Sequence, residues 1–153
     1  MQKQEIIIRS AEKSDMGAVL SLVKELAEYE KAPEQVTTTP DDYRRNFEEG
    51  VFEALVAEMD GEVVGMALYY LCWSTWRGRM LYLDDFVVRQ SHRRYGIGQL
   101  LFDAFMEKAR EKDCFLVKWQ VLDWNEPALR FYEKNRAIIE TEWWNGKIFL
   151  KPV

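Results

Sequence analysis

Hydrophobic and polar positions in the first fifty residues follow one pattern typical of a strand and another typical of helices. The apolar run from Ile6 to Arg9 predicts a strand. Apolar residues then recur at helical spacing from Met16 to Ala27, which predicts an amphipathic helix that ends near Lys31. The segment Thr39-Pro40-Asp41-Asp42 is typical of a helix start, and Gly50 follows the end of the short helix that we expect there.

Strands are predicted in the middle of the chain. The segments from Phe52 to Met59 and from Val63 to Leu71 flank Asp60-Gly61, a dipeptide that favours the tight turn of a β-hairpin. The apolar run from Met80 to Val88 predicts a further strand.

Helices and strands alternate in the remainder of the chain. We expect a helix from Gly96 to Lys112, a strand from Cys114 to Val121, and a short helix from an Asn125 cap through Tyr132. A final hairpin is predicted from Ile138 to Trp143 and from Lys147 to Leu150, joined around Asn145-Gly146. The order βααβββαβαββ predicts an α/β fold with a mixed, mostly antiparallel sheet and helices on both faces.

Composition and charge limit the classes of function. The 153 residues, 48% of them hydrophobic, are enough for one globular domain spanning residues 1–153. The net charge of -5 disfavours nucleic acid as a partner and suits a cationic substrate. We find no apolar run of membrane-spanning length and no signal-peptide pattern, so we expect a cytoplasmic protein with no membrane partner. Cys72 and Cys114 lack metal-ligand spacing, so we expect buried thiols and no metal.

The segment Arg93-Arg94-Tyr95-Gly96-Ile97-Gly98 lies between a predicted strand and a predicted helix. Glycines at a helix start let backbone N–H groups approach a pyrophosphate, and the arginines add positive charge. The segment matches neither the dinucleotide-binding nor the triphosphate-binding glycine motif. It is therefore a candidate anion site of another kind, with a solvated basic loop as the alternative. His92, beside three arginines, is interpreted as a solvated or phosphate-adjacent residue.

Several blocks together resemble the GNAT acetyltransferase superfamily, and the likeness extends from about Ile6 to Leu150. The blocks that carry it are Leu81 to Val88, Arg93 to Gly98 and Asn125 to Lys134. Further blocks are similar to the spermidine/spermine (diamine) N-acetyltransferase group, and to its thialysine-acetylating branch in particular: Lys24 to Glu30, Glu34 to Val36, Ser74 to Trp76, and Leu122 to Asn125. The resemblance implies a single GNAT domain over residues 1–153.

The resemblance also implies where acetyl-CoA binds as cosubstrate. Backbone groups of Phe86, Val87 and Val88 would pair with the pantetheine arm like an added strand, and Asn125 and Tyr132 would lie beside the thioester. The pyrophosphate would be held by the loop and the helix start, which comprise Arg93, Arg94, Tyr95, Gly96, Ile97, Gly98 and Gln99.

In the same family pattern, Tyr132 would be the general acid that protonates the leaving thiolate. Asp84 would help to remove the amine proton through water. The amine would lie near Tyr29, Glu30, Trp76, Asp84 and Asp85. On a regular strand Asp84 and Asp85 would point to opposite faces, and only a bulge would change that.

Three positions depart from the family pattern. Asp84 stands where Glu is typical, Arg136 where Gly is usual, and Ser74 where some polyamine-specific relatives have an acid. The pair Trp143-Trp144 is open to three interpretations: it caps the substrate cleft, forms a subunit contact, or is buried in the last hairpin.

These observations favour an N-acetyltransferase that transfers acetyl from acetyl-CoA to a primary amine of a diamine, a polyamine or a thialysine-like amino acid. Direct attack on the thioester needs no covalent enzyme intermediate. The family analogy implies a homodimer. Two alternatives stay open at this point: acetylation of a protein N-terminus or lysine, and a non-catalytic acyl-CoA-binding module.

Overall fold

The computed structural model describes residues 5–153, which divide into two compact units, one up to Gln120 and the other from Val121 to Val153. The elements in chain order are β1 (Ile6–Ser10), η1 (Lys13–Asp15), α1 (Met16–Tyr29), η2 (Pro33–Gln35), α2 (Pro40–Glu48), β2 (Glu53–Met59), β3 (Glu62–Ser74), β4 (Gly78–Val88), η3 (Gln90–Tyr95), α3 (Ile97–Glu111), β5 (Leu116–Trp119) and α4 (Glu126–Lys134).

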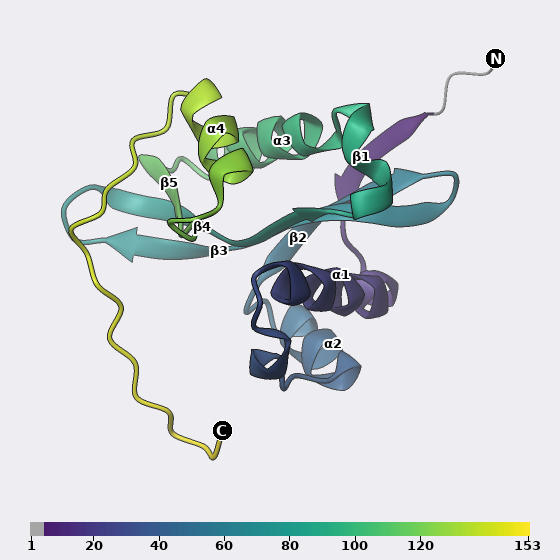
Figure 1. Cartoon of the computed structure of the whole chain (residues 1–153), viewed down its shortest axis with the longest axis horizontal. Helices are drawn as coiled ribbons and strands as arrows, with labels where there is room; N and C mark the ends of the chain where they lie inside the picture. The colour runs from purple at the N-terminus through teal and green to yellow at the C-terminus, as the bar shows by residue number, and fades with distance from the viewer. Residues whose placement is uncertain (1–4) are drawn as a thin grey trace. The chain divides into compact units, whose positions relative to one another are not determined.

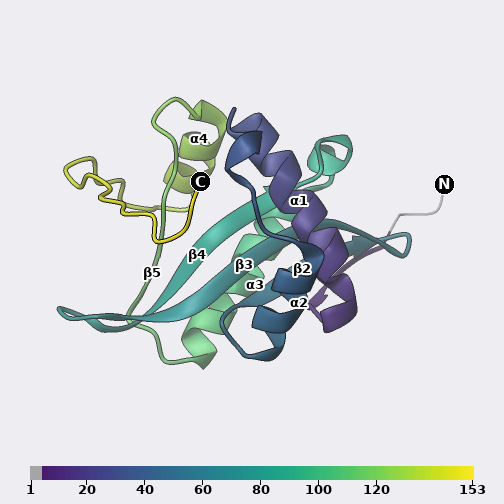
Figure 2. The same cartoon turned by 90° about the horizontal axis from the view of Figure 1, so that it is seen from below.

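The first unit is built on a five-stranded mixed sheet with strand order β1-β2-β3-β4-β5. Only the pairing of β4 with β5 is parallel, and the other neighbours are antiparallel. Helices α1 and α2 cover one face of this sheet and α3 covers the other (Figures 1 and 2). The predicted mixed, mostly antiparallel sheet with helices on both faces is therefore confirmed.

The hairpin of β2 and β3 turns where the sequence predicts. Asp60 and Gly61 have φ angles of 53° and 76°, and Met59 pairs with Glu62 across the turn. Positive φ at both central residues is the requirement of a type I′ turn, which is why Asp-Gly favours it.

Each face of the sheet has its own core. Toward α1, residues such as Val19 and Leu22 pack in one buried cluster with Val56 and Met66 of the sheet. Toward α3, the rings of Tyr69 and Phe105 lie 5.6 Å apart between centroids.

Gly65 sets how closely α3 approaches the sheet. A Cβ at this position would lie 3.1 Å from Leu101 Cδ1 and 3.2 Å from the carbonyl oxygen of Val87. Any larger residue would push α3 away from β4 or distort the strand. The start of α3 is thus held at a fixed distance from the end of β4.

The predicted C-terminal hairpin is wrong. Residues 138–153 contain no strand, and their apolar side chains are exposed: Ile138 is 87% exposed, Trp144 94% and Leu150 95%. The two predicted segments are short, and an isolated two-stranded hairpin is marginal in water without a further strand or helix to cover it. The unit from Val121 to Val153 contains no strand that could extend such a hairpin. Burial of Trp143-Trp144 in that hairpin is wrong for the same reason.

The other predicted elements are present with small changes at their ends. β5 is shorter than the predicted strand from Cys114 to Val121, because only four of its residues pair with β4. No helix within residues 5–153 combines the length and the apolar composition needed to cross a bilayer.

Candidate active site

The part of β4 beyond Leu83 has a neighbouring strand on one side only. β3 pairs with β4 along its length, whereas β5 pairs only with Met80 to Leu83. Within residues 5–153 no strand continues this pairing beside the stretch that contains Phe86, Val87 and Val88. Backbone groups at the edge of a sheet can bind an extended chain as an added strand. The edge lies where the family resemblance implies the pantetheine arm.

The predicted anion loop forms η3 and the first turn of α3. Arg93, Arg94 and Tyr95 are exposed, whereas Ile97 is buried and anchors the helix start. Gly96 occupies the N-cap position of α3 with φ 73°, and no side chain caps the helix there. Uncapped N–H groups at a helix start, with the positive end of the helix dipole, form a site for an anion.

The two glycines of the loop have different physical roles. Gly96 has a positive φ that favours glycine, although a Cβ there would meet nothing within 4 Å. A Cβ at Gly98 would lie 3.8 Å from Phe86 and 3.9 Å from Val88, which is ordinary contact distance. The protein's own packing therefore does not require glycine at position 98, whereas a ligand that approaches the backbone closely would.

A β-bulge places both acids of β4 on one face of the sheet. Leu68 pairs with Asp85, but the next residue, Tyr69, pairs with Leu83, so that Asp84 is the extra residue. Leu68 belongs to the core beneath α1, which puts its partner Asp85 on that face. Tyr70 lies on the same face as Leu68, and its hydroxyl is 3.3 Å from Asp84 Oδ1. The opposite orientation expected for a regular strand therefore does not occur.

Asp85 is the most strongly perturbed carboxyl group of this face. Burial, together with the negative charges of Asp84 and Glu30, raises the pKa of the Asp85 carboxyl to about 7. Burial also raises the pKa of Glu30, which directly follows α1. A cation beside Asp85 would offset the negative charges of Asp84 and Glu30 and favour the ionised carboxylate, so this cluster suits a protonated amine.

Two tyrosines belong to this cluster and were not predicted as site residues. Burial, with the charges of Asp85 and Asp84, raises the pKa of Tyr43 of α2. Tyr70 stacks on Tyr82 with centroids 5.4 Å apart, and burial and the Asp84 charge raise its pKa. No spacing in the sequence connects α2 with β4, because the contact arises only when α2 packs on the sheet.

The remaining predicted amine-site residues lie in different places. Tyr29 is the last residue of α1, is 38% exposed, and is adjacent to Glu30. Trp76 lies in the turn after β3 and is 81% exposed. The start of β4 at Gly78 is six residues from Asp84, which is roughly 20 Å along a strand. One copy of the chain therefore does not bring Trp76 to the acids.

Asn125 and Tyr132 lie in the second unit. Asn125 caps α4 by accepting a hydrogen bond from the Ala128 N–H to Oδ1 at 3.4 Å, as predicted. Tyr132 is 7% exposed and its ring lies 5.6 Å from that of Phe131. Gln99, the last residue predicted for the pyrophosphate, is half-buried in α3 of the first unit and donates to Asp103.

The thiols and the histidine have ordinary surroundings. Cys72 and Cys114 are half-buried rather than fully buried, and burial raises the pKa of both thiols. His92 is half-buried and shares a hydrogen bond of 2.7 Å with Ser91. Within residues 5–153, no group of three or more His, Cys, Asp or Glu side chains is arranged to hold a metal ion.

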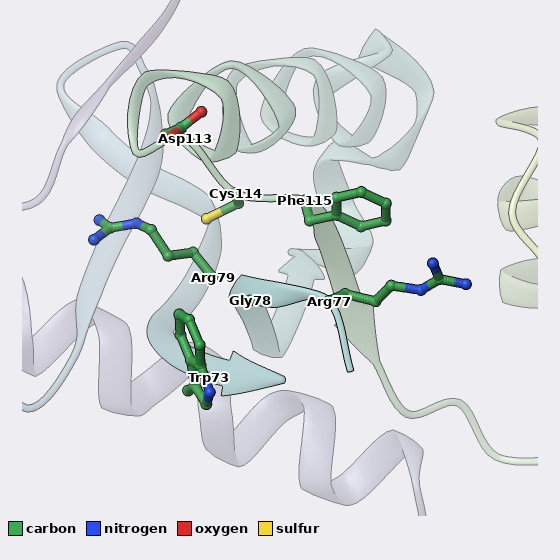
Figure 3. A pocket seen from close by; sticks show the side chains of 7 residues that line it. All are labelled: Trp73, Arg77, Gly78, Arg79, Asp113, Cys114 and Phe115. Atoms are coloured by element: carbon green, nitrogen blue, oxygen red, sulfur yellow. The ribbon is translucent and has the colours of Figure 1, made fainter. Parts of the chain in front are cut away.

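A cavity of about 400 Å³ lies between the β3–β4 turn and the connection from α3 to β5, and Cys114 is among the residues that line it. Trp73 and Arg79 line one side of it, and Arg77 and Phe115 line the other (Figure 3). The Arg77 guanidinium lies 5.4 Å from the centre of the Phe115 ring. None of the residues that line this cavity belongs to the predicted site.

Comparisons with known proteins agree on one family. The profile of the Acetyltransferase (GNAT) family matches residues 19–137. The thialysine N-epsilon-acetyltransferase of Bos taurus is 38% identical over 152 residues, covering 92% of this chain and 89% of that protein. The spermidine/spermine N(1)-acetyltransferase-like protein 1 of Homo sapiens is 31% identical over 140 residues, covering 86% of this chain and 20% of that protein. Aminoglycoside N-acetyltransferase AAC(6')-Iy, solved in complex with CoA, has the same fold at 18% identity, with a TM-score of 0.74 and coverage of 98% of both chains.

Proposed function

Because the chain belongs to the GNAT family of N-acetyltransferases, we propose that it transfers acetyl from acetyl-CoA to a primary amine of a small cationic substrate, such as a diamine, a polyamine or a thialysine-like amino acid. The observation that carries the choice of substrate class is the cluster formed by Glu30, Asp84 and Asp85 on the α1 side of the sheet. The name of the bovine relative supports the same class.

Acetyl-CoA would extend from the start of α3 along the edge of β4 that lies beyond its pairing with β5. Its pyrophosphate would accept hydrogen bonds from the N–H groups around Gly96 and Gly98 and from Arg93 and Arg94. Its pantetheine arm would pair with the backbone of β4 from Phe86 to Val88. No side chain caps the start of α3, and within residues 5–153 no strand pairs with β4 on its β5 side beyond Leu83. Together these features fit a thioester carrier with a charged head and an extended arm.

The substrate amine would arrive as an ammonium ion, because the unperturbed pKa of a primary amine is about 10.4. Asp85 and Glu30 would bind a cationic group of the substrate, and its charge would favour the ionised form of Asp85. Asp84, which is exposed and reached by the Tyr70 hydroxyl, would accept the amine proton through a water molecule. The neutral amine would then attack the thioester carbonyl directly.

The leaving thiolate of CoA needs a proton, and Tyr132 is our candidate donor. Asn125 would position the thioester beside it. These two assignments follow the family pattern of the segment from Asn125 to Lys134, which the family match includes. Because that match spans both compact units, we also infer that residues 1–153 work as one acetyltransferase domain.

Trp76 supports a homodimer as the working form. It precedes the start of β4 at Gly78, which is itself roughly 20 Å along the strand from Asp84, so Trp76 is too far away to reach an amine bound at the acids of its own chain. The β3–β4 turn of a second copy could supply this indole, which is exposed. We propose a cytoplasmic homodimer in which Trp76 contacts the amine bound by its partner.

The proposal is tested by following the release of CoA thiol from acetyl-CoA with a panel of diamines, spermidine, thialysine, lysine and peptides. We expect release with the small cationic amines and loss of most of it in Asp85→Asn. Release with peptides alone would instead indicate a protein acetyltransferase. Binding of CoA without release to any amine would indicate a non-catalytic module.

A further inference from the structure

One face of α1 contacts the loop that we assign to the pyrophosphate. Ser21, Glu25 and Tyr29 follow one another at intervals of four residues, so they lie on the same side of the helix. Each of the three contacts the segment from Arg89 to Arg93. Nothing in the sequence motif of the loop indicates this contact, because α1 is more than fifty residues away in the chain.

Glu25 holds the beginning of the loop with both carboxylate oxygens. Arg89 Nη1 donates to Oε2 at 3.1 Å, and the backbone N–H of Gln90 donates to Oε1 at 3.0 Å. Gln90 is the first residue of η3, so the carboxylate satisfies a backbone donor where the loop leaves β4. Arg89 also donates through Nε to the Val63 carbonyl oxygen, which fixes its side chain between α1 and the sheet.

Tyr29 holds the middle of the loop. The Arg93 guanidinium carbon lies 5.4 Å from the centre of the Tyr29 ring, and Arg93 Nε donates to the Val88 carbonyl oxygen at 3.3 Å. A guanidinium carries its donors in its plane, so a ring over its face leaves the donors on its edge available. The remaining N–H groups of Arg93 can therefore bind a phosphate while the ring fixes the orientation of the plane.

We propose that Glu25 and Tyr29 are positioning residues for the acetyl-CoA site, and that Tyr29 thereby couples this site to the amine site. The inference rests on the proposed function, because it takes the loop as the pyrophosphate site and Tyr29 as a neighbour of the amine. It extends that function by making one helix face responsible for the order of the cofactor loop. Binding free energies are reciprocal, so an amine that orders Tyr29 also tightens CoA binding.

The test is a calorimetric titration with CoA alone, in the absence of any amine. Tyr29→Leu removes the aromatic ring and should raise the Kd of CoA about two- to fivefold, the effect of one exposed cation–π contact. Tyr29→Phe keeps the ring and should restore the wild-type Kd. If Tyr29 mattered only for helix stability, the two variants would have similar Kd values for CoA.

Glu25 provides a second, independent test with a matched control on the same helix. Glu25→Ala should raise the Kd of CoA about fivefold relative to Glu28→Ala, because both remove one negative charge but only Glu25 contacts the loop. Thermal midpoints of all variants identify any loss of folding. In a second titration, a saturating diamine should tighten CoA binding to the wild type more than to Tyr29→Leu.

The possible outcomes separate this inference from the proposed function. If the wild type does not bind CoA, the proposed function fails. If the wild type binds CoA and acetylates amines, while Tyr29→Leu and Glu25→Ala bind CoA within about twofold of their controls, positioning by α1 is refuted and the acetyltransferase stands.

Discussion

Asp84 and Asp85 are adjacent in the chain and yet lie on the same face of the sheet, because Asp84 is the extra residue of a β-bulge between the pairs Tyr69–Leu83 and Leu68–Asp85. Bulges often re-aim side chains at functional sites. Here the bulge brings two carboxyl groups onto one face, and their negative charge lowers the free energy of unfolding. This loss of stability can be measured without knowing the substrate.

The first prediction concerns stability at different pH values. The pKa of Asp85 is raised to about 7 in the folded state, mainly by burial, from an ordinary value of 3.8. Such a group stabilises the fold below pH 4, and this contribution is lost as pH rises through 7. The Asp85→Asn variant should therefore be more stable than the wild type at pH 8. Its free energy of unfolding relative to the wild type should increase by on the order of 2 to 4 kcal/mol between pH 4 and pH 8. Denaturant unfolding measures both values.

The matched control for this experiment is Asp103→Asn, which changes an exposed carboxyl group on α3. The difference in free energy of unfolding between this variant and the wild type should not increase from pH 4 to pH 8. An equally flat response in Asp85→Asn would show that Asp85 ionises normally in the folded protein.

The second prediction concerns the pH dependence of activity. The value of kcat/KM reports ionisations of the free enzyme and of the free amine. Because ionised Asp85 would bind the cationic amine, kcat/KM should fall as pH decreases through about 7. In Asp85→Asn this decrease of kcat/KM with falling pH should disappear, and kcat/KM at pH 8 should be low. Initial rates with one diamine across pH 5.5 to 8.5 provide the test. The same pH dependence in the variant would show that a group other than Asp85 ionises near pH 7.

The third prediction separates the role of Tyr132 from simple packing. General acid catalysis contributes about 10²- to 10⁴-fold to rate, so Tyr132→Phe should lower kcat by about 100-fold while the Kd of CoA stays nearly constant. Tyr69→Phe is the control, because Tyr69 is also buried but packs against Phe105 on the α3 face. Comparable kcat values for the two variants would exclude Tyr132 as the proton donor.

The fourth prediction concerns the end of α4. Arg136 has φ 64°, a conformation that favours glycine, and its N–H donates to the Glu133 carbonyl oxygen at 2.9 Å. Relief of this strain in Arg136→Gly should stabilise the protein by roughly 1 kcal/mol. Thermal or denaturant unfolding would show the gain. A loss of stability would mean that the Arg136 side chain contributes more than its backbone conformation costs.

Local patterns were sufficient to predict much of the fold. Asp60-Gly61 fixed the β2–β3 hairpin because its turn needs positive φ at two adjacent residues. Thr39 and Asn125 cap the helices that follow them, as their side-chain chemistry predicts. The same reasoning failed at Asn145-Gly146, where a favourable turn dipeptide is present but the strands that it would join have no sheet to extend.

The candidate site was predictable only in part. The loop from Arg93 to Gly98 was recognisable because its glycines and arginines are contiguous in the chain. The register shift at Asp84 was not, because it depends on the pairing of β4 with β3 rather than on β4 alone. Tyr43 was missed for a similar reason, since only the packing of α2 brings it into electrostatic contact with Asp85.

The proposed function depends on binding of the CoA diphosphate by the backbone at Gly96 and Gly98. Calorimetric titration of the wild type and of Gly98→Ala with CoA measures this contact. A Cβ at Gly98 makes only ordinary contacts with Phe86 and Val88, so the variant should fold with nearly the wild-type thermal midpoint. We predict that the wild type binds CoA and that Gly98→Ala binds it at least about tenfold more weakly, a change of about 1.4 kcal/mol. No binding by the wild type, or equal binding by the two proteins, would show that the backbone at Gly98 does not bind the diphosphate.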